Sequence, residues 1–240
     1  MKQHLHMREQ MVEACHGLAA KGLGATIGGH VSMRIPGEAL YWTNVLDLCF
    51  EEMTVDDMVL VDFDGKVVHS DRPISPGIDF HQNIYKLRPD IHSIVHTHGF
   101  WSVAQSAFSR EPKIWHNLAT YFYKRTALSP DDTIEAISPV LKDNIAIIMP
   151  WHGAITLGRD LPEAAALHAT FDFVCKLDVT MDGSSAEPMP PDACERMQVL
   201  LGKAKYLERT YELMCREGRK TLEQAKLDAA ERTRLKARAA

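Results

Sequence analysis

The chain has 240 residues, of which 45% are hydrophobic and 25% charged, the composition of a globular protein with enough length for one large core. Its net charge of −5 makes nucleic acid a poor partner, because phosphate backbones are bound by clustered Lys and Arg. No apolar run approaches the roughly 20 residues of a bilayer span, and the first residues lack a signal-peptide pattern, so we expect a cytoplasmic protein without membrane contact.

The first third of the chain alternates between a helix and short strands. Apolar residues at three- and four-residue spacings predict an amphipathic helix over 4–21. Residues 24–34 lead from a glycine-rich turn into a short strand, and 40–46 predict a second strand. An Asp-Gly pair in the middle of 58–68 supplies the positive φ angles of a tight turn, so this segment is predicted to form a hairpin.

Further elements follow from apolar periodicity, capping residues and buried apolar runs: helices at 80–87, 100–108, 131–141 and 161–177, and strands at 93–98 and 146–150. The proline-rich stretch 188–191 is the clearest linker. Beyond it the sequence is charged and helical. We therefore divide the chain into a domain at 1–187 and a linker with a helical C-terminal extension at 188–240, which we expect to pack on the core or on a neighbouring subunit.

Three histidines stand at the ends of two predicted buried strands. His96 and His98 are two residues apart, so in a strand their side chains point to the same face and both imidazoles can reach one ion. His152 follows the second strand and precedes Gly153, whose missing side chain lets the backbone turn closely. Three imidazoles with an open position suit one divalent metal ion, zinc first, with manganese, cobalt or iron as alternatives. The competing interpretation is that each is a hydrogen-bonded core residue.

Several motifs occur around these histidines in a fixed order. Their members are Gly28 to Arg34, Phe80-His81, Ile84-Tyr85, Arg88-Pro89-Asp90, His96-Thr97-His98 and Trp151-His152-Gly153. In this order they resemble the class II aldolase/adducin family, which includes fuculose-phosphate aldolase-type enzymes. The resemblance spans roughly 11–179. His30 stands where asparagine is common in the family.

The resemblance implies an α/β fold, a three-layer α/β/α sandwich with a central, mainly antiparallel sheet. It also implies a homotetramer with active sites at subunit boundaries, and a divalent ion on His96, His98 and His152. In the aldolases of the family the metal polarises a ketone and stabilises the enediolate that forms when a carbon–carbon bond breaks, and Lewis-acid chemistry agrees with this role.

The chain departs from the family at Gly77, where the aldolases carry a glutamate that acts as acid and base. Another group must then move the proton, and His81, Asp79 and His30 are the candidates for this catalytic role. Asp79 could instead cap the helix that begins near it, and His81 could only orient another group. Decarboxylation suits a site without the glutamate, because its later protonation can use water or a histidine.

The candidate substrate-binding residues are Thr26, Gly28, Gly29 and Ser75, which occupy stretches where sugar-phosphate aldolases hold their phosphate. Glycine-rich turns can cradle anions through backbone N–H groups. Pro76, however, has no N–H to donate, which weakens phosphate binding and favours a carboxylate or phenolic substrate.

Three further residues could contact the substrate. Arg34 could pair with a carboxylate, and a structural ion pair is the equal alternative. Tyr121 and Tyr123 lie in a stretch that, in the family, approaches the active site of the neighbouring subunit. They could line a pocket for an aromatic ring, although packing in the core or an interface is the favoured interpretation.

The sequence thus predicts a small-molecule enzyme, a divalent-metal-dependent carbon–carbon lyase. It would carry out aldol cleavage or decarboxylation of a hydroxy, oxo or hydroxyaromatic acid through a metal-stabilised enolate. One alternative is a mononuclear iron oxygenase acting on an aromatic or 2-oxo acid. The other is a non-catalytic, adducin-like binding module, against which the retention of three converging imidazoles argues.

Overall fold

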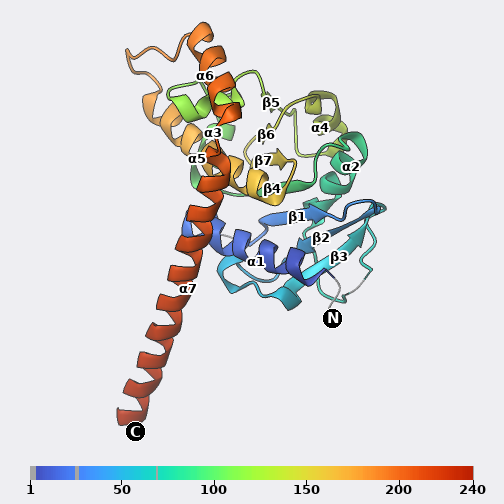
Figure 1. Ribbon diagram of the computed structural model, residues 1–240, viewed down its shortest axis with the longest axis vertical. Coiled ribbons are helices and arrows are strands. Elements are labelled where there is room, and N and C mark those ends of the chain that lie inside the picture. The colour runs from blue at the N-terminus through green and yellow to red at the C-terminus, as the bar shows by residue number, and fades with distance from the viewer. Residues whose placement is uncertain (1–3, 25–26, 69, 240) are drawn as a thin grey trace.

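A computed structural model describes residues 4–24, 27–68 and 70–239, and within them the chain forms one seven-stranded sheet (Figure 1). The strand order is β3-β2-β1-β4-β7-β6-β5. Every pairing is antiparallel except that of β5 with β6. The bounds are β1 His30–Arg34, β2 Leu40–Asn44, β3 Met58–Asp62, β4 Ser93–Thr97, β5 Thr126–Leu128, β6 Ala146–Met149 and β7 Gly153–Gly158.

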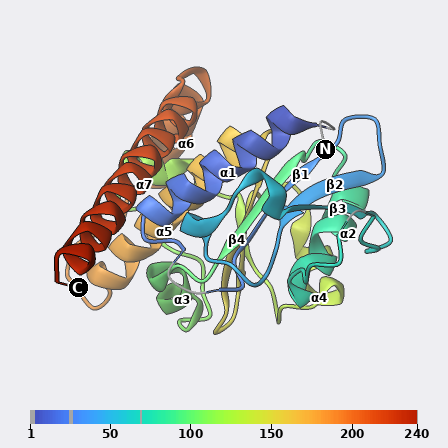
Figure 2. The same cartoon turned by 90° about the horizontal axis from the view of Figure 1, so that it is seen from below.

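Helices cover both faces of this sheet, which confirms the predicted α/β/α sandwich with a mainly antiparallel sheet. The helices are α1 Leu5–Ala20, α2 Asp79–Leu87, α3 Phe100–Ser106, α4 Ile134–Leu141, α5 Leu161–Met181, α6 Pro191–Lys203 and α7 Tyr206–Ala239. Helices α1 and α5 lie on one face, and α2 and α4 on the other (Figure 2). Short 3-10 turns at Phe50–Glu52, Val55–Asp57, Pro76–Ile78 and Asn117–Phe122 complete the fold. None of the helices in the described ranges is long and apolar enough to cross a membrane.

Most predicted elements are confirmed, and the differences have local causes. The second arm of the hairpin pairs only through a bridge between Val61 and Val67, so it is not a full strand. Helix α4 begins at Ile134 because the Thr133 hydroxyl accepts a hydrogen bond from the Ala136 N–H and caps it there. Strands β5 and β7 were not predicted from the sequence. The first has only three residues, and the second lies between two glycines.

The C-terminal helices pack on the rest of the chain, which is one of the two alternatives predicted for the extension. Helix α7 runs along α1 and then continues past the body of the protein (Figure 1). The two helices cross at Gly17 and Gly218. A Cβ built on Gly218 would lie 2.7 Å from the His16 carbonyl carbon, and one on Gly17 would lie 3.0 Å from that of Met214. The close approach of the two helices therefore requires glycine at both positions. The boundary at 187/188 stays a prediction.

The Gly218→Ala variant is expected to lower the free energy of unfolding by about 1–3 kcal/mol, because the added methyl group must push α7 away from α1. The control is Gly202→Ala in α6, where a Cβ meets nothing within 4 Å. That change should be neutral or stabilising by up to ~1 kcal/mol, since alanine favours helix over glycine. Urea denaturation of both variants measures the difference. Equal effects would show that α7 does not pack as tightly on α1 as described.

Candidate metal centre

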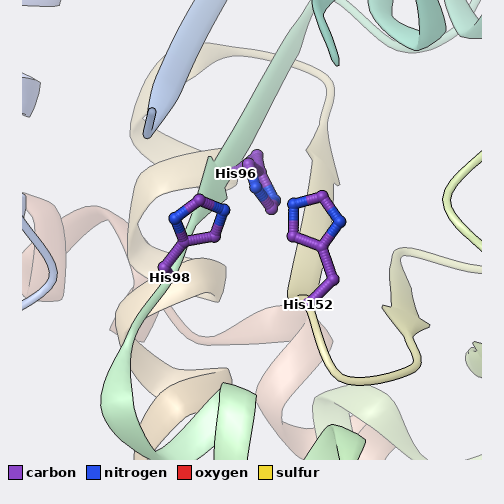
Figure 3. A group of neighbouring side chains, drawn as sticks. All are labelled: His96, His98 and His152. Atoms are coloured by element: carbon purple, nitrogen blue, oxygen red, sulfur yellow. The ribbon is translucent and has the colours of Figure 1, made fainter. Parts of the chain in front are cut away.

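The three predicted ligand histidines meet at one end of the central strands of the sheet. His96 is in β4, His98 directly follows that strand, and His152 lies in the tight turn between β6 and β7. Because β4 pairs with β7, with His96 opposite Ile155, the turn that carries His152 comes close to the end of β4. One nitrogen from each ring lies within 4.8 Å of the others, and Figure 3 shows the three rings converging on a common centre.

Two of the three rings are oriented by hydrogen bonds through Nδ1. His96 Nδ1 lies 3.0 Å from the Ala154 carbonyl oxygen, to which it can only donate. His152 Nδ1 lies 3.0 Å from an oxygen of the Asp132 carboxylate. A ring that donates from Nδ1 keeps the lone pair of Nε2 for a metal, and such outer partners fix the ring orientation in known metal sites.

The environment favours the neutral form of the His96 and His98 rings. Burial, followed by the neighbouring His30, His152 and His98 rings, holds the pKa of His96 well below its ordinary value. Burial, followed by His152, also lowers the pKa of His98. A metal binds the neutral imidazole, so a depressed pKa leaves the lone pairs available at neutral pH. The cluster is compatible with a divalent metal ion, and no other group of three or more His, Cys, Asp or Glu residues converges in this way among the described residues.

Asp132→Asn is expected to weaken zinc binding by roughly tenfold, since the loss of an outer carboxylate typically costs 10- to 100-fold and this carboxylate is exposed. The neighbouring Asp131→Asn is the matched control, because the Asp131 carboxylate accepts hydrogen bonds from Thr133 and does not contact His152. Competition with a chromophoric chelator measures both affinities. An Asp132→Asn protein with unchanged zinc affinity would show that the contact does not support the metal.

A second group of buried polar side chains lies beside the metal cluster. His30 stands opposite His96 in the β1–β4 pairing, with ring centroids 4.7 Å apart. His30 Nδ1 is 2.7 Å from His81 Nε2, and His81 Nδ1 is 2.6 Å from Ser32 Oγ. Ser32 Oγ is in turn 2.6 Å from the Tyr85 hydroxyl. We call His30, His81, Ser32 and Tyr85 the His30–His81 network.

Both histidines of this network are neutral because they are buried. Burial, then His81, lowers the pKa of His30 well below its ordinary value, and burial, then His96, does the same for His81. His30 Nδ1 is used within the network, so Nε2 is the nitrogen left for other contacts. A Cβ built on Gly77 would lie 3.6 Å from that Nε2 and 3.8 Å from Ser75 Oγ. Gly77 therefore lies directly against His30 and Ser75, and a side chain at this position would contact both.

The glycine-rich segment before β1 also lies against the cluster. A Cβ on Gly28 would come 3.3 Å from the His98 ring, and Gly28 has a φ of +99°. The next residue, Gly29, packs against Phe50, and its carbonyl accepts a hydrogen bond from the Asn44 side chain. Small residues are thus required where the backbone approaches the histidines. Thr26 lies outside the described residues.

The other predicted site residues have partners away from the histidines. Arg34, at the far end of β1, donates to the Tyr85 carbonyl and lies over the Phe63 ring. Asp79 is the exposed first residue of α2, and the expectation that it caps this helix is wrong, since Ile78 is the N-cap and no side chain caps it. Tyr121 donates to the Leu201 carbonyl, and Lys124 lies over the ring of Tyr123.

Sequence reasoning missed Asp132 and the part that Ser32 and Tyr85 play in the His30–His81 network. Asp132 stands 20 residues before His152 in a loop, and nothing in its local pattern links it to that ring. Ser32 and Tyr85 belong to motifs that were noted, but their bonds to each other and to His81 depend on how α2 docks against β1.

The chain is similar to several known proteins in sequence and in fold. A 4-hydroxy-3-prenylphenylpyruvate oxygenase/4-hydroxy-3-prenylbenzoate synthase of Streptomyces roseochromogenus subsp. oscitans is 28% identical over 189 residues, covering 73% of this chain and 68% of the relative. Decarboxylase NovR of Streptomyces niveus is 26% identical over 183 residues, covering 71% and 67%. The solved structure of L-fuculose 1-phosphate aldolase from Glaciozyma antarctica PI12 superposes with a TM-score of 0.83 at 25% identity, covering 94% and 92%.

The relatives thus include an aldolase, a decarboxylase and an oxygenase. Residues 9–179 match the family described as the Class II Aldolase and Adducin N-terminal domain, which is well over half of the chain. The chain therefore belongs to the class II aldolase and adducin N-terminal domain family.

Proposed function

We propose that this chain is a divalent-metal-dependent carbon–carbon lyase, with His96, His98 and His152 as the metal ligands. The observation that carries this proposal is the convergence of three imidazoles, two of them held by Nδ1 hydrogen bonds that free Nε2. Nitrogen ligands with an open position suit zinc first, and also manganese, cobalt or iron. When bound, the cation would act as a Lewis acid that stabilises negative charge developing on a substrate oxygen.

Nε2 of His30, the nitrogen that is not bonded to His81, is the proposed proton donor and acceptor. The network has two neutral arrangements. In one, Tyr85 donates to Ser32, Ser32 to His81 and His81 to His30, so that His30 Nε2 carries a proton. In the other, every bond is reversed, Tyr85 donates to the His92 carbonyl at 3.5 Å, and Nε2 offers a lone pair. His81 therefore serves as a positioning residue that sets the tautomer of His30.

Decarboxylation fits these groups better than aldol cleavage. When carbon dioxide leaves a carboxylate, the bonding electron pair stays on the substrate, and the carbon then needs one proton, which His30 Nε2 can give and water can replace. Aldol cleavage also requires a base that first removes a hydroxyl proton. The family's aldolases use a glutamate for this, and the chain has Gly77 there. The favoured substrate class is a hydroxy or oxo acid, or a hydroxyaromatic acid, and aldol cleavage stays the second reaction of the same class.

Ser75, Gly28 and Gly29 are the proposed contacts to the acid group of the substrate. Ser75 Oγ lies near Gly77 and His30, and the Gly28 backbone lies against the His98 ring. Thr26, Arg34 and Asp79 were also predicted for the site. Arg34 has partners of its own, which argues for a structural role.

The test is turnover without oxygen. Protein loaded with zinc or manganese should release carbon dioxide, or an aldehyde, from acids of the proposed class under nitrogen, and chelation should abolish the reaction. Released carbon dioxide and aldehyde distinguish decarboxylation from aldol cleavage. Activity that survives complete removal of the metal would overturn the proposal.

A mononuclear iron oxygenase is the second candidate, favoured by the relative named as an oxygenase. Oxygen uptake that depends on ferrous ion and on substrate would support it. Turnover under nitrogen would exclude it.

We further propose that the active protein is a homotetramer, as the family resemblance implies, and that it is located in the cytoplasm. Tyr121 and Tyr123 pack near α6 in their own chain, so any contact they make with substrate would have to cross a subunit boundary. Light scattering that gives the mass of one chain would contradict the tetramer.

A further inference from the structure

Trp151 has a backbone conformation that a bulky residue rarely adopts. It is the third residue of the turn between β6 and β7, in which the His152 N–H donates to the Met149 carbonyl at 3.2 Å. Pro150 occupies the second position, and Trp151 has a φ of +55°. A turn with positive φ at its third position favours glycine or asparagine, because a side chain there crowds the backbone. The tryptophan therefore costs stability at this position.

No hydrogen bond or ring contact with the described residues offsets this cost. Trp151 is 76% exposed, and its indole takes part in no hydrogen bond, ring contact or cation–π contact with the described residues. Strain that persists without a compensating contact inside the molecule points to a contact outside it, and such strain collects at functional sites.

Trp151 borders a hollow beside the metal cluster. Trp151, Pro150 and Val103 line a hollow of about 500 Å³ together with His98, His152 and Asp132. Trp151, Pro150 and Val103 form an apolar wall of this hollow. His98 and His152 are predicted metal ligands. The hollow is shallow and open to solvent, so a planar ring could lie against its wall. A flat ring lying on the indole would share this hollow with a metal ion bound to the histidines. Asp132 also lines the hollow, and its carboxylate is already hydrogen-bonded to His152.

We propose that an aromatic ring of the substrate stacks on the Trp151 indole, while oxygen atoms of the same substrate bind the metal. This inference rests on the proposed metal-dependent function and narrows its substrate class to aromatic acids. Stacking on the indole would raise the affinity of the protein for any substrate with a planar ring, whereas the metal would bind the acid group. A second copy of this chain could also cover the indole, and the test separates the two.

The test compares mandelate with lactate, two 2-hydroxy acids that offer the same hydroxyl and carboxylate and differ in a phenyl against a methyl group. Isothermal titration calorimetry on the zinc-loaded protein should show mandelate binding about tenfold more tightly. In Trp151→Gly, the mandelate affinity should fall to that of lactate. Lactate affinity and zinc content should not change, and the melting temperature should stay or rise. Trp151→Phe keeps a ring and should keep part of the preference.

Several results would overturn the proposal. One is a preference for mandelate that is unchanged in Trp151→Gly. Another is a clear fall in melting temperature, since the indole would then be structural. A change to a smaller assembly without loss of the preference would assign the indole to a subunit interface. If neither acid binds zinc-loaded protein, both this inference and the proposed function fail, whereas equal binding of the two acids removes only the stacking.

Discussion

Replacing His96 and His98 together by alanine is expected to abolish metal binding and to lower kcat/KM by about 10³-fold or more. Lewis-acid stabilisation contributes several kcal/mol to the transition state, and each ~1.4 kcal/mol corresponds to a factor of ten. The remaining His152 cannot hold the ion alone. Its ring is bonded to Asp132 and has no second imidazole beside it once the other two are removed.

Elemental mass spectrometry of protein purified without added metal gives the readout. His92→Ala is the matched control, because His92 directly precedes the same strand β4 and lies outside the cluster. It should keep both metal and activity. Since His96 is buried and its loss leaves a cavity, the half-exposed His98→Ala serves as a second variant, with circular dichroism to confirm folding. Near-stoichiometric metal in the double variant would show that the three histidines are not the ligands.

His30→Asn is expected to lower kcat by about 10²- to 10⁴-fold with the metal retained, the usual contribution of a positioned acid or base. Asparagine is small and polar, so it can still bond to His81 and limit the loss of stability. It has, however, no nitrogen at the position that His30 Nε2 occupies beside Gly77. The KM for the substrate should change much less than kcat, because the lost interaction belongs to the proton transfer.

The other members of the His30–His81 network give a graded series. Ser32→Ala cuts the bond to His81 and should have a smaller effect on kcat than His30→Asn. Tyr85→Phe removes only the last hydroxyl and should have the smallest effect. Metal content should be equal in all three variants. Equal loss in Tyr85→Phe and His30→Asn would mean that the network acts only through folding, and full activity of His30→Asn would remove it from the mechanism.

The sequence by itself determined the class of the fold and the identity of the metal-binding candidates. Apolar periodicity located most helices and strands, because burial of one face imposes that period directly on the residues. The spacing of His96 and His98 is read in the same way, since alternate residues of a strand share a face. The order of the motifs indicated the family, which the match over 9–179 confirms.

Only the tertiary structure decided which distant residues become partners. The pairing of β4 with β7 brings His152 to His96, and the docking of α2 on β1 brings His81 and Tyr85 to Ser32. The tertiary structure also places the Asp132 carboxylate within hydrogen-bond distance of His152 and shows that Asp79 does not cap α2. These contacts are decided by register and packing between elements, which depend on surfaces assembled from the whole chain. No local pattern records them, so the pocket around Trp151 and the network behind His30 could not be read from the residues in order.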